Sequence, residues 1–532
     1  MGGLKEYWDL IRKYPTYQGG FIWDFVDQAQ WWPVDAQETG SDHVFIFGGE
    51  FNDVDPSDKA FCCNGIIAAD RTLHPHAYEV AYQLRSILTS SMPADALEGK
   101  VQVYNENFFI DLSRYMLHWN VQVDGRQVLS GVLSDLNVGP QQTAVVALGY
   151  SADDIKGAAG LDTLEGVDVY LNVSYQLRRN DGILPAGSQV AYDQIVVCEK
   201  DQPVFNGASY TSLPSYSVQE TMHTFEGDGA LPWKVVFDEK TGALVRYVVG
   251  VKEMISEPLL PCFGRAMTEN DLGAAFHKKL SGWLYPELSV RDFKVEKSSE
   301  CYCVTVDYVP FKVNAADSDD LETECLAAVS MCYKVYADGN IEGIESLADG
   351  GNLSKAAILP RFGMEFAMPG GCSVFEFYGK GPFENYCDRN TAAVVGHYVQ
   401  RVEDQYHWGY VRPQESGTRT DLRWMKVTDD DGSGILVTSD VRFSASALPL
   451  GRRQIDMSIR EFGQGDGLRH RHSLELKKDA CEGMRSLGRT YVNFDLVQMG
   501  LGCVNSWGQW PRAEYLISAR PMQFRFVIQP VF

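Results

Sequence analysis

Long apolar runs are missing from the sequence. No window of about 18 residues is apolar enough for a transmembrane helix, and the N-terminal residues lack the basic-then-apolar order of a signal peptide. Basic side chains are also scarce, with 47 Lys and Arg against 71 Asp and Glu and a formal net charge of -24. A surface of that charge repels a phosphate backbone. We therefore expect neither a membrane span nor a nucleic-acid partner.

Cysteine is sparse and lacks metal-binding spacing. The 532 residues include 12 cysteines and no C-x-x-C pair, so we expect reduced thiols rather than a disulfide scaffold. Cys62 and Cys63 are adjacent, while Cys301 and Cys303 lie in an alternating run that predicts a strand over residues 301–309. We interpret all four as buried structural thiols, which we favour over a metal site.

Several catalytic and metal-binding motifs are absent as well. There is no G-x-S-x-G elbow, Walker loop or dinucleotide fingerprint, which argues against serine-hydrolase, phosphoryl-transfer and hydride-transfer chemistry. The acidic clusters at 317–320 and 429–431 lack the spaced ligands of a calcium loop and predict solvated hairpin tips. His470 and His472 would share one face of a strand, as a metal pair requires, but no nearby carboxylate or thiol completes a set. We favour a structural pair.

Composition and pattern indicate packed domains. Hydrophobic residues make up 45% of the chain and charged residues 22%, as in ordinary globular proteins. Apolar spacing predicts a helix over 4–14, a strand buried on both faces over 18–26, and a second helix over 76–87. This order predicts the end of a partial (β/α)8 barrel in residues 1–88.

The rest of the sequence is rich in short alternating runs. Residues 89–202, with Trp119 suited to a core, predict an immunoglobulin-like β-sandwich. Residues 203–532 predict one large antiparallel β-sandwich, which makes the expected fold class mainly β. Hairpins are expected at residues 124–125, 239–242 and 338–339.

One segment of the partial barrel could line a pocket. A barrel strand that ends in aromatic and acidic residues opens onto the face where barrel active sites lie, and Trp23, Asp24, Asp27 and Gln28 occupy that position. A tryptophan face covers the apolar side of a sugar, while carboxylates and amides bind its hydroxyl groups. This lining suits carbohydrate. A core tryptophan with capping acids is an equally good interpretation of these residues alone.

Seven short motifs follow one another along the chain: QGGFIWDFVDQ at 18–28, FGGE at 47–50, FCCNG at 61–65, ADRTLHP at 69–75, FYGKGPFENYCDR at 377–389, YVRPQESGTR at 410–419, and MGLG followed by NSW at 499–507. Their order resembles that of the beta-galactosidases of glycoside hydrolase family two. The resemblance spans essentially the whole chain and implies the end of the catalytic barrel, an immunoglobulin-like domain and the small-chain domain.

The resemblance also implies roles for particular residues. Trp23 resembles the tryptophan of the galactosyl-binding wall, and Trp507 resembles the aromatic platform for the leaving group. Asn64 and the backbone carbonyl of Phe61 resemble ligands of a monovalent cation, usually sodium, that contacts the 6-hydroxyl of the sugar. An Asp ligand from an earlier part of the family chain has no counterpart here, and neither do the family's magnesium ligands.

The departure from the family concerns catalysis. Family members retain configuration with two glutamates, and both lie upstream of the point where this sequence begins. Nothing specifies a replacement pair among Asp24, Asp27, Glu50 and Asp53. We therefore expect the C-terminal part of a beta-galactosidase, which acts on terminal beta-galactosides such as lactose, is inactive alone, and is completed by an N-terminal half or subunit in a homo- or hetero-oligomer.

A noncatalytic carbohydrate-binding or oligomer-scaffolding β-sandwich protein is the alternative interpretation. The low number of cysteines is compatible with both the cytoplasm and the periplasm. We favour the cytoplasm, and the periplasm would follow if a longer parent chain carries a signal peptide.

Overall fold

The structure is a computed structural model that describes residues 2–39, 41–47, 50, 54, 59–202, 212–316, 324–456, 472–477, 480, 488–502, 505 and 508–532. The chain forms two compact units. Unit 1 comprises Met1–Ala77, Pro203–Asn390 and Tyr398–Phe532, and unit 2 comprises Tyr78–Gln202 and Thr391–His397. The division into three domains stays a prediction.

The N-terminal part of the chain is mostly loop with short helices and strands. Its elements are α1 (Leu4–Lys13), β1 (Gln30–Pro33), α2 (Ala36–Thr39), β2 (His43–Ile46), the 3-10 helix η1 (Lys59–Cys62), and α3 (Pro75–Gln83). The predicted helix over 4–14 is confirmed as α1, which buries Leu4 and leaves Tyr7 and Leu10 exposed. Strands β1 and β2 pair antiparallel, Gln30 with Ile46.

One sequence prediction in this part is wrong. The segment 18–26 is not a strand buried on both faces: Phe21, Trp23 and Phe25 are exposed, and its one bridge joins Val26 to Ile67 in parallel. A strand is buried on both faces only where strands pair with it on both sides and helices cover it. In the described part of the chain, the backbone-to-backbone hydrogen bonds of Asp24 and Phe25 go only to residues 64–67.

The second predicted helix is shorter than expected. Its N-terminus is Pro75, whose fixed φ suits the first helical position, and it ends at Gln83 rather than 87. The β-branched Ile87, with no exposed surface, instead begins strand β3 in unit 2.

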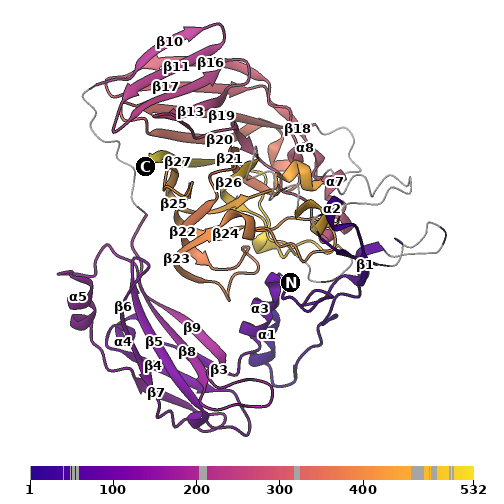
Figure 1. Cartoon of the computed structure of the whole chain (residues 1–532), viewed down its shortest axis with the longest axis vertical. Helices are drawn as coiled ribbons and strands as arrows, with labels where there is room; N and C mark the ends of the chain where they lie inside the picture. Colours follow the sequence, from indigo (N-terminus) through magenta and orange to yellow (C-terminus); the bar gives the residue numbers. More distant parts are fainter. Residues whose placement is uncertain are drawn as a thin grey trace. The chain divides into compact units, whose positions relative to one another are not determined.

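Unit 2 is a two-sheet sandwich (Figure 1). One sheet has the order β3-β4-β7 and the other β6-β5-β8-β9. Trp119 is buried in the core as predicted, and β5 alternates buried and half-buried residues. The predicted hairpin is confirmed between β5 and β6, where Asp124 and Gly125 both have positive φ. Its elements are β3 (Ile87–Ser90), α4 (Pro93–Leu97), β4 (Lys100–Asn105), η2 (Leu112–Arg114), β5 (Tyr115–Val123), β6 (Arg126–Leu133), β7 (Thr143–Ala147), α5 (Ala152–Ala159), β8 (Val169–Leu177) and β9 (Gln189–Cys198).

The remainder of unit 1 is a large curled antiparallel sheet (Figure 1). Its first elements are β10 (Ser215–Gln219), β11 (Met222–Asp228), β12 (Pro232–Asp238), β13 (Ala243–Val249), β14 (Lys252–Glu253), β15 (Glu257–Cys262), α6 (Glu269–Gly273), α7 (Phe276–Lys279), α8 (Ser281–Leu284), β16 (Val290–Lys297), β17 (Cys301–Tyr308), β18 (Phe311–Val313), β19 (Cys325–Tyr336) and β20 (Ile341–Gly351). Its later elements are η3 (Leu353–Lys355), β21 (Arg361–Pro369), β22 (Val374–Gly381), β23 (Val394–Arg401), η4 (Val402–Asp404), β24 (Arg419–Thr428), β25 (Gly434–Leu448), β26 (Arg489–Gln498), η5 (Ala513–Tyr515) and β27 (Met522–Val531).

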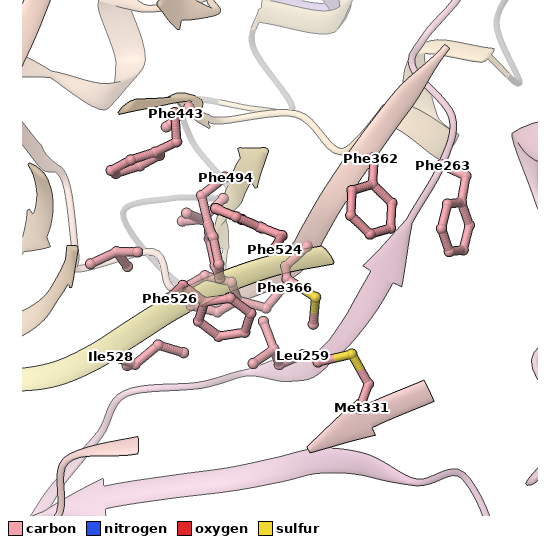
Figure 2. Packing of buried hydrophobic residues seen from close by; sticks show 14 of the residues in the cluster. Leu259, Phe263, Met331, Phe362, Phe366, Phe443, Phe494, Phe524, Phe526 and Ile528 are labelled. Carbon is pink, nitrogen blue, oxygen red and sulfur yellow. The ribbon is translucent and has the colours of Figure 1, made fainter. Parts of the chain in front are cut away.

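The strands pair in a long succession, β13-β15-β21-β26-β25-β27-β20-β19-β17. The twist between neighbouring strands accumulates along such a succession and curls the sheet. The enclosed core is rich in phenylalanine, including Phe366, Phe494, Phe524 and Phe526 (Figure 2). Packing of these rings and of the aliphatic chains around them is the main source of stability for the domain. The mainly β fold class is therefore confirmed.

Several local predictions for this sheet hold. Hairpins join β12 to β13 and β19 to β20 at the expected turns, and residues 301–308 form β17. The acidic cluster 429–431 is the tip between β24 and β25, while 317–320 lies outside the described residues. None of the described helices is long and apolar enough to span a membrane.

The thiols are less buried than predicted. Cys301 is buried, but Cys62, Cys63 and Cys303 are only half-buried. Cys62 ends the short helix η1 and Cys63 follows it, and both pack against a small cluster that contains Phe45 and Phe47. Within the described part of the chain, no cysteine forms a disulfide and no group of three His, Cys, Asp or Glu side chains could hold a metal ion.

Candidate functional site

Backbone hydrogen bonds bring together two of the predicted site segments, 23–28 and 61–67. The Asp24 amide donates to the Asn64 carbonyl at 3.2 Å, and the Ile66 amide donates to the Asp24 carbonyl at 3.0 Å. The Gln28 amide donates to the Cys62 carbonyl at 3.0 Å. Trp23 and Asn64 are thus held at adjoining positions although they are far apart in the sequence.

The Trp23 and Asn64 side chains differ sharply in exposure. Trp23 is 75% exposed, which contradicts the interpretation of a core tryptophan and leaves its ring face open to a ligand. The Asn64 Oδ1 and Nδ2 atoms are both buried, and neither has a hydrogen-bond partner among the described residues. A buried amide without a partner is costly, so this arrangement suits a side chain that binds a ligand or cation.

Phe61 lies in η1, three residues before Asn64. This short segment therefore places the Phe61 backbone carbonyl and the Asn64 amide in the same loop. Oxygen atoms of this kind are the ligands that hard cations prefer. Trp507, the third predicted binding residue, lies outside the described residues.

The acidic candidates occupy different environments. Asp24 accepts hydrogen bonds from Gln28 Nε2 at 2.9 Å and from the Phe25 amide at 2.5 Å, and these bonds lower the pKa of its carboxyl group. Asp27 is only 5% exposed, so it does not line an open pocket as its position predicted. Asp53 lies outside the described residues.

Asp27 supports the loop that carries Asn64. Its Oδ1 accepts from the Gly65 amide at 2.7 Å and its Oδ2 contacts His74 Nε2 at 2.7 Å. A side chain on Gly65 would overlap the backbone of Val26 and Asp27, so glycine permits this close approach.

His74 is buried in an aromatic cluster that sequence reasoning missed. Its ring stacks on His76 and on Tyr410, and its Nδ1 lies 2.8 Å from His407 Nε2. Burial, reinforced by His74, lowers the pKa of His407 to about 3, so its imidazole is neutral at pH 7. His74 is part of a recognised motif, but His407 lies 333 positions away, and no local spacing connects the two.

Glu50 and His472 form a second buried contact. His472 Nε2 lies 2.8 Å from Glu50 Oε1, and its Nδ1 lies 3.1 Å from Glu475 Oε2. Burial opposes charging of the ring, but the hydrogen bonds to Glu475 and Glu50 prevail and raise the pKa of His472. The prediction of a strand here is wrong, because His472 precedes a helical turn in which the Glu475 amide bonds to its carbonyl.

Two carboxylates that the sequence analysis did not connect with His472 contact its ring: Glu50 from a distant segment and Glu475 from the following turn. Among the described residues, they do not form a group that could hold a metal ion with it. His470 lies outside the described residues. Asp27 and Glu50 are both occupied by buried hydrogen bonds. The described contacts therefore give these two carboxylates supporting roles.

Three protein-family models match the chain in succession. Residues 1–88 match the glycosyl hydrolases family 2 TIM barrel domain, residues 101–197 match beta-galactosidase domain 4, and residues 228–528 match the beta galactosidase small chain. Together they define a multidomain protein of the glycosyl hydrolase family 2 class. The small-chain match extends over more than half of the residues, and the chain belongs to the beta galactosidase small chain family.

Curated relatives agree with this assignment. The chain is 29% identical over 531 residues to a beta-galactosidase of Priestia megaterium, and 30% identical over 538 and 542 residues to those of Halalkalibacterium halodurans and Streptococcus thermophilus. Each alignment includes 100% of this chain but only 46%, 47% and 46% of the respective relative. The chain therefore spans about half the length of the curated relatives it matches.

Among solved structures, a galactose 1-epimerase from Lactobacillus acidophilus aligns with 59% of this chain and 96% of its own, at a TM-score of 0.29 and 8% identity. A score that low carries no argument about fold or function.

Proposed function

We propose that the chain is the C-terminal part of a retaining beta-galactosidase that hydrolyses terminal non-reducing beta-D-galactosides such as lactose. The observation that carries this proposal is the match to beta-galactosidases over the whole of this chain and less than half of theirs. In this proposal the acid/base and nucleophilic glutamates, about 5 to 5.5 Å apart in retaining enzymes, belong to an N-terminal half or subunit.

The role of this chain is to bind and orient the sugar. Trp23 would cover its apolar face, and Trp507 would form a platform for the leaving group. The exposed Trp23 ring and its backbone connection to Asn64 support the first assignment. The assembled enzyme would be a homo- or hetero-oligomer in which this chain completes the pocket.

Asn64 Oδ1 and the Phe61 carbonyl would hold a monovalent cation, with sodium as the first candidate. The buried and unpartnered Asn64 amide fits that role, because a cation would satisfy its oxygen. When bound, the ion supplies positive charge for a sugar hydroxyl oxygen. Magnesium ligands, in this proposal, come from the other half of the enzyme.

Hydrolysis of a chromogenic beta-galactoside tests the proposal. The purified chain is assayed alone and after mixing with an N-terminal segment of a related beta-galactosidase that carries both glutamates. We expect activity only in the mixture. Activity of the chain alone would refute the division of catalytic groups, and inactivity of both would favour a noncatalytic carbohydrate-binding or scaffolding protein.

A pair of tryptophan variants tests the pocket itself. Trp23→Ala should raise KM in the mixture by about fivefold, since stacking on an aromatic face contributes about 1 kcal/mol. Trp31→Ala is the matched control, because Trp31 is 56% exposed on the neighbouring strand β1 and has no assigned role. Equal effects of the two substitutions would refute the assignment of Trp23.

A further inference from the structure

The backbone around Asn64 is fixed at three points. The Asn64 carbonyl accepts from the Asp24 amide, the Gly65 amide donates to Asp27 Oδ1, and His76 Nε2 lies 2.8 Å from the Gly65 carbonyl. The Asn64 side-chain amide, in contrast, has no partner in the described part of the chain. The protein thus uses its hydrogen bonds to set the backbone and leaves the amide for a ligand.

A chain of hydrogen bonds connects the Gly65 amide, through Asp27 and His74, to His407, which lies between β23 and β24 of the large antiparallel sheet. Asp27 Oδ2 lies 2.7 Å from His74 Nε2, and His74 Nδ1 lies 2.8 Å from His407 Nε2. An ionised carboxylate only accepts, so His74 Nε2 donates to Asp27, and a single N–H joins the two imidazoles. The exposed fractions of Asp27 and His74 side chains are both 3%, so water does not compete with these bonds.

His407 is itself held in place from the other side. Its backbone amide donates to Ser416 Oγ at 2.9 Å, and that hydroxyl donates to Glu384 Oε2 at 2.8 Å. Glu384 also binds Arg389 Nη2 at 2.6 Å. These bonds hold the His407 backbone in place. The His407 ring in turn holds His74, and His74 holds Asp27, which binds the loop that carries Asn64.

We propose that His407 is a positioning residue for Asn64. Through His74 and Asp27 it fixes the Gly65 amide, and so the direction in which the neighbouring Asn64 amide projects. The inference rests on the proposed function, because it assumes that Asn64 binds the sugar or its cation. In this inference, His407 affects ligand binding only through the residues that hold Asn64, without touching the ligand.

Amide hydrogen exchange at Gly65 in the full chain tests the connection without any activity. Loss of the buried hydrogen bond loosens the backbone that carries Gly65, so His407→Phe should accelerate Gly65 exchange by about tenfold, equivalent to about 1.4 kcal/mol. His407→Gln should stay within about threefold of the wild type, because a glutamine amide places an N–H near the position of Nε2. His277→Phe is the control, since His277 is exposed on α7.

The same variants are then assayed in the complemented mixture. His407→Phe should raise both KM and the half-saturating sodium concentration by about tenfold while kcat changes less than twofold, and His407→Gln should restore both. Unchanged exchange at Gly65, or faster exchange with unchanged KM and sodium dependence, would overturn the inference. An inactive wild-type mixture would instead contradict the proposed function, and the exchange result would still decide the connection.

A second measurement covers the case in which His407→Phe does not fold. In the wild-type chain, nitrogen-15 spectra of the histidine rings should show His74 protonated at Nε2 and one proton shared between His74 and His407. Spectra that show no shared proton between the His74 and His407 rings would overturn the inference.

Discussion

Glu345 offers a quantitative test of the sandwich core. Its side chain on β20 has no exposed surface, and neither carboxyl oxygen has a hydrogen-bond partner among the described residues. Its partners in register are Met331 and Phe524, which lie in the apolar cluster (Figure 2). Burial, with a smaller contribution from Asp495, raises the pKa of Glu345 well above its ordinary 4.5. In the folded protein, burial therefore favours the protonated form of this carboxyl group.

The sign of the effect follows from proton binding. The unfolded chain loses the Glu345 proton near pH 4.5, whereas the raised pKa makes the folded chain keep it to a higher pH. Stability therefore falls as pH rises from the unfolded to the folded pKa. Each pH unit between the ordinary and the raised pKa costs about 1.4 kcal/mol. Glu345→Met removes this cost together with the penalty of about 1 to 3 kcal/mol for unpaired buried oxygens. The gain in stability should therefore increase as pH rises above 4.5.

Urea unfolding of the full chain, followed by tryptophan fluorescence at several pH values, measures this gain. The transition of unit 1 is compared between the wild type, Glu345→Met and Glu296→Met, the last being an exposed position on β16. Only for Glu345→Met should the difference in unfolding free energy from the wild type grow as pH rises. A difference that is independent of pH, or a variant less stable than the wild type at pH 8, would refute the reasoning.

Three further predictions concern other parts of the chain. Gly65→Ala should destabilise unit 1 by about 1 to 3 kcal/mol, because its methyl group overlaps Asp27, and Gly371→Ala, with open space around it, should not shift the thermal midpoint. His472→Gln should flatten the fall in stability above pH 6.5. A raised histidine pKa stabilises the fold below the unfolded pKa, and this contribution is lost as pH rises through the folded pKa; parallel pH profiles would contradict this. Gly125→Ala should lower the unfolding free energy of unit 2 by about 1 kcal/mol because of its positive φ, whereas Gly157→Ala in α5 should not.

Local features of the fold were predictable from the sequence, because they depend on neighbouring residues. Two examples are the helix α1, predicted from the spacing of its apolar residues, and the Asp-Gly turn after β5. Both are confirmed. The segment 18–26 shows the limit of this reasoning. Its apolar run predicts a buried strand, but burial depends on which partners are present, and a local pattern does not contain that information.

The candidate site was predictable only in part. Trp23 and Asn64 were identified through motif resemblance, and the structure holds their segments together. The role of Asp27 was not, because a carboxylate near an aromatic residue looks the same in sequence whether it faces a pocket or a buried histidine. His407 and His472 depend on contacts across several hundred positions, for which a single sequence has no signal.

The bond between the Gln28 amide and the Cys62 carbonyl has a consequence for engineering. This bond joins the two ends of the segment from residue 28 to residue 62, and within that segment β1 and β2 pair with each other. Extra chain inserted between β1 and β2 would lengthen a loop that is already closed, at an entropic cost of only about 0.6 kcal/mol per doubling. A reporter tag or small domain could therefore be accommodated there without altering the spacing between Trp23 and Asn64.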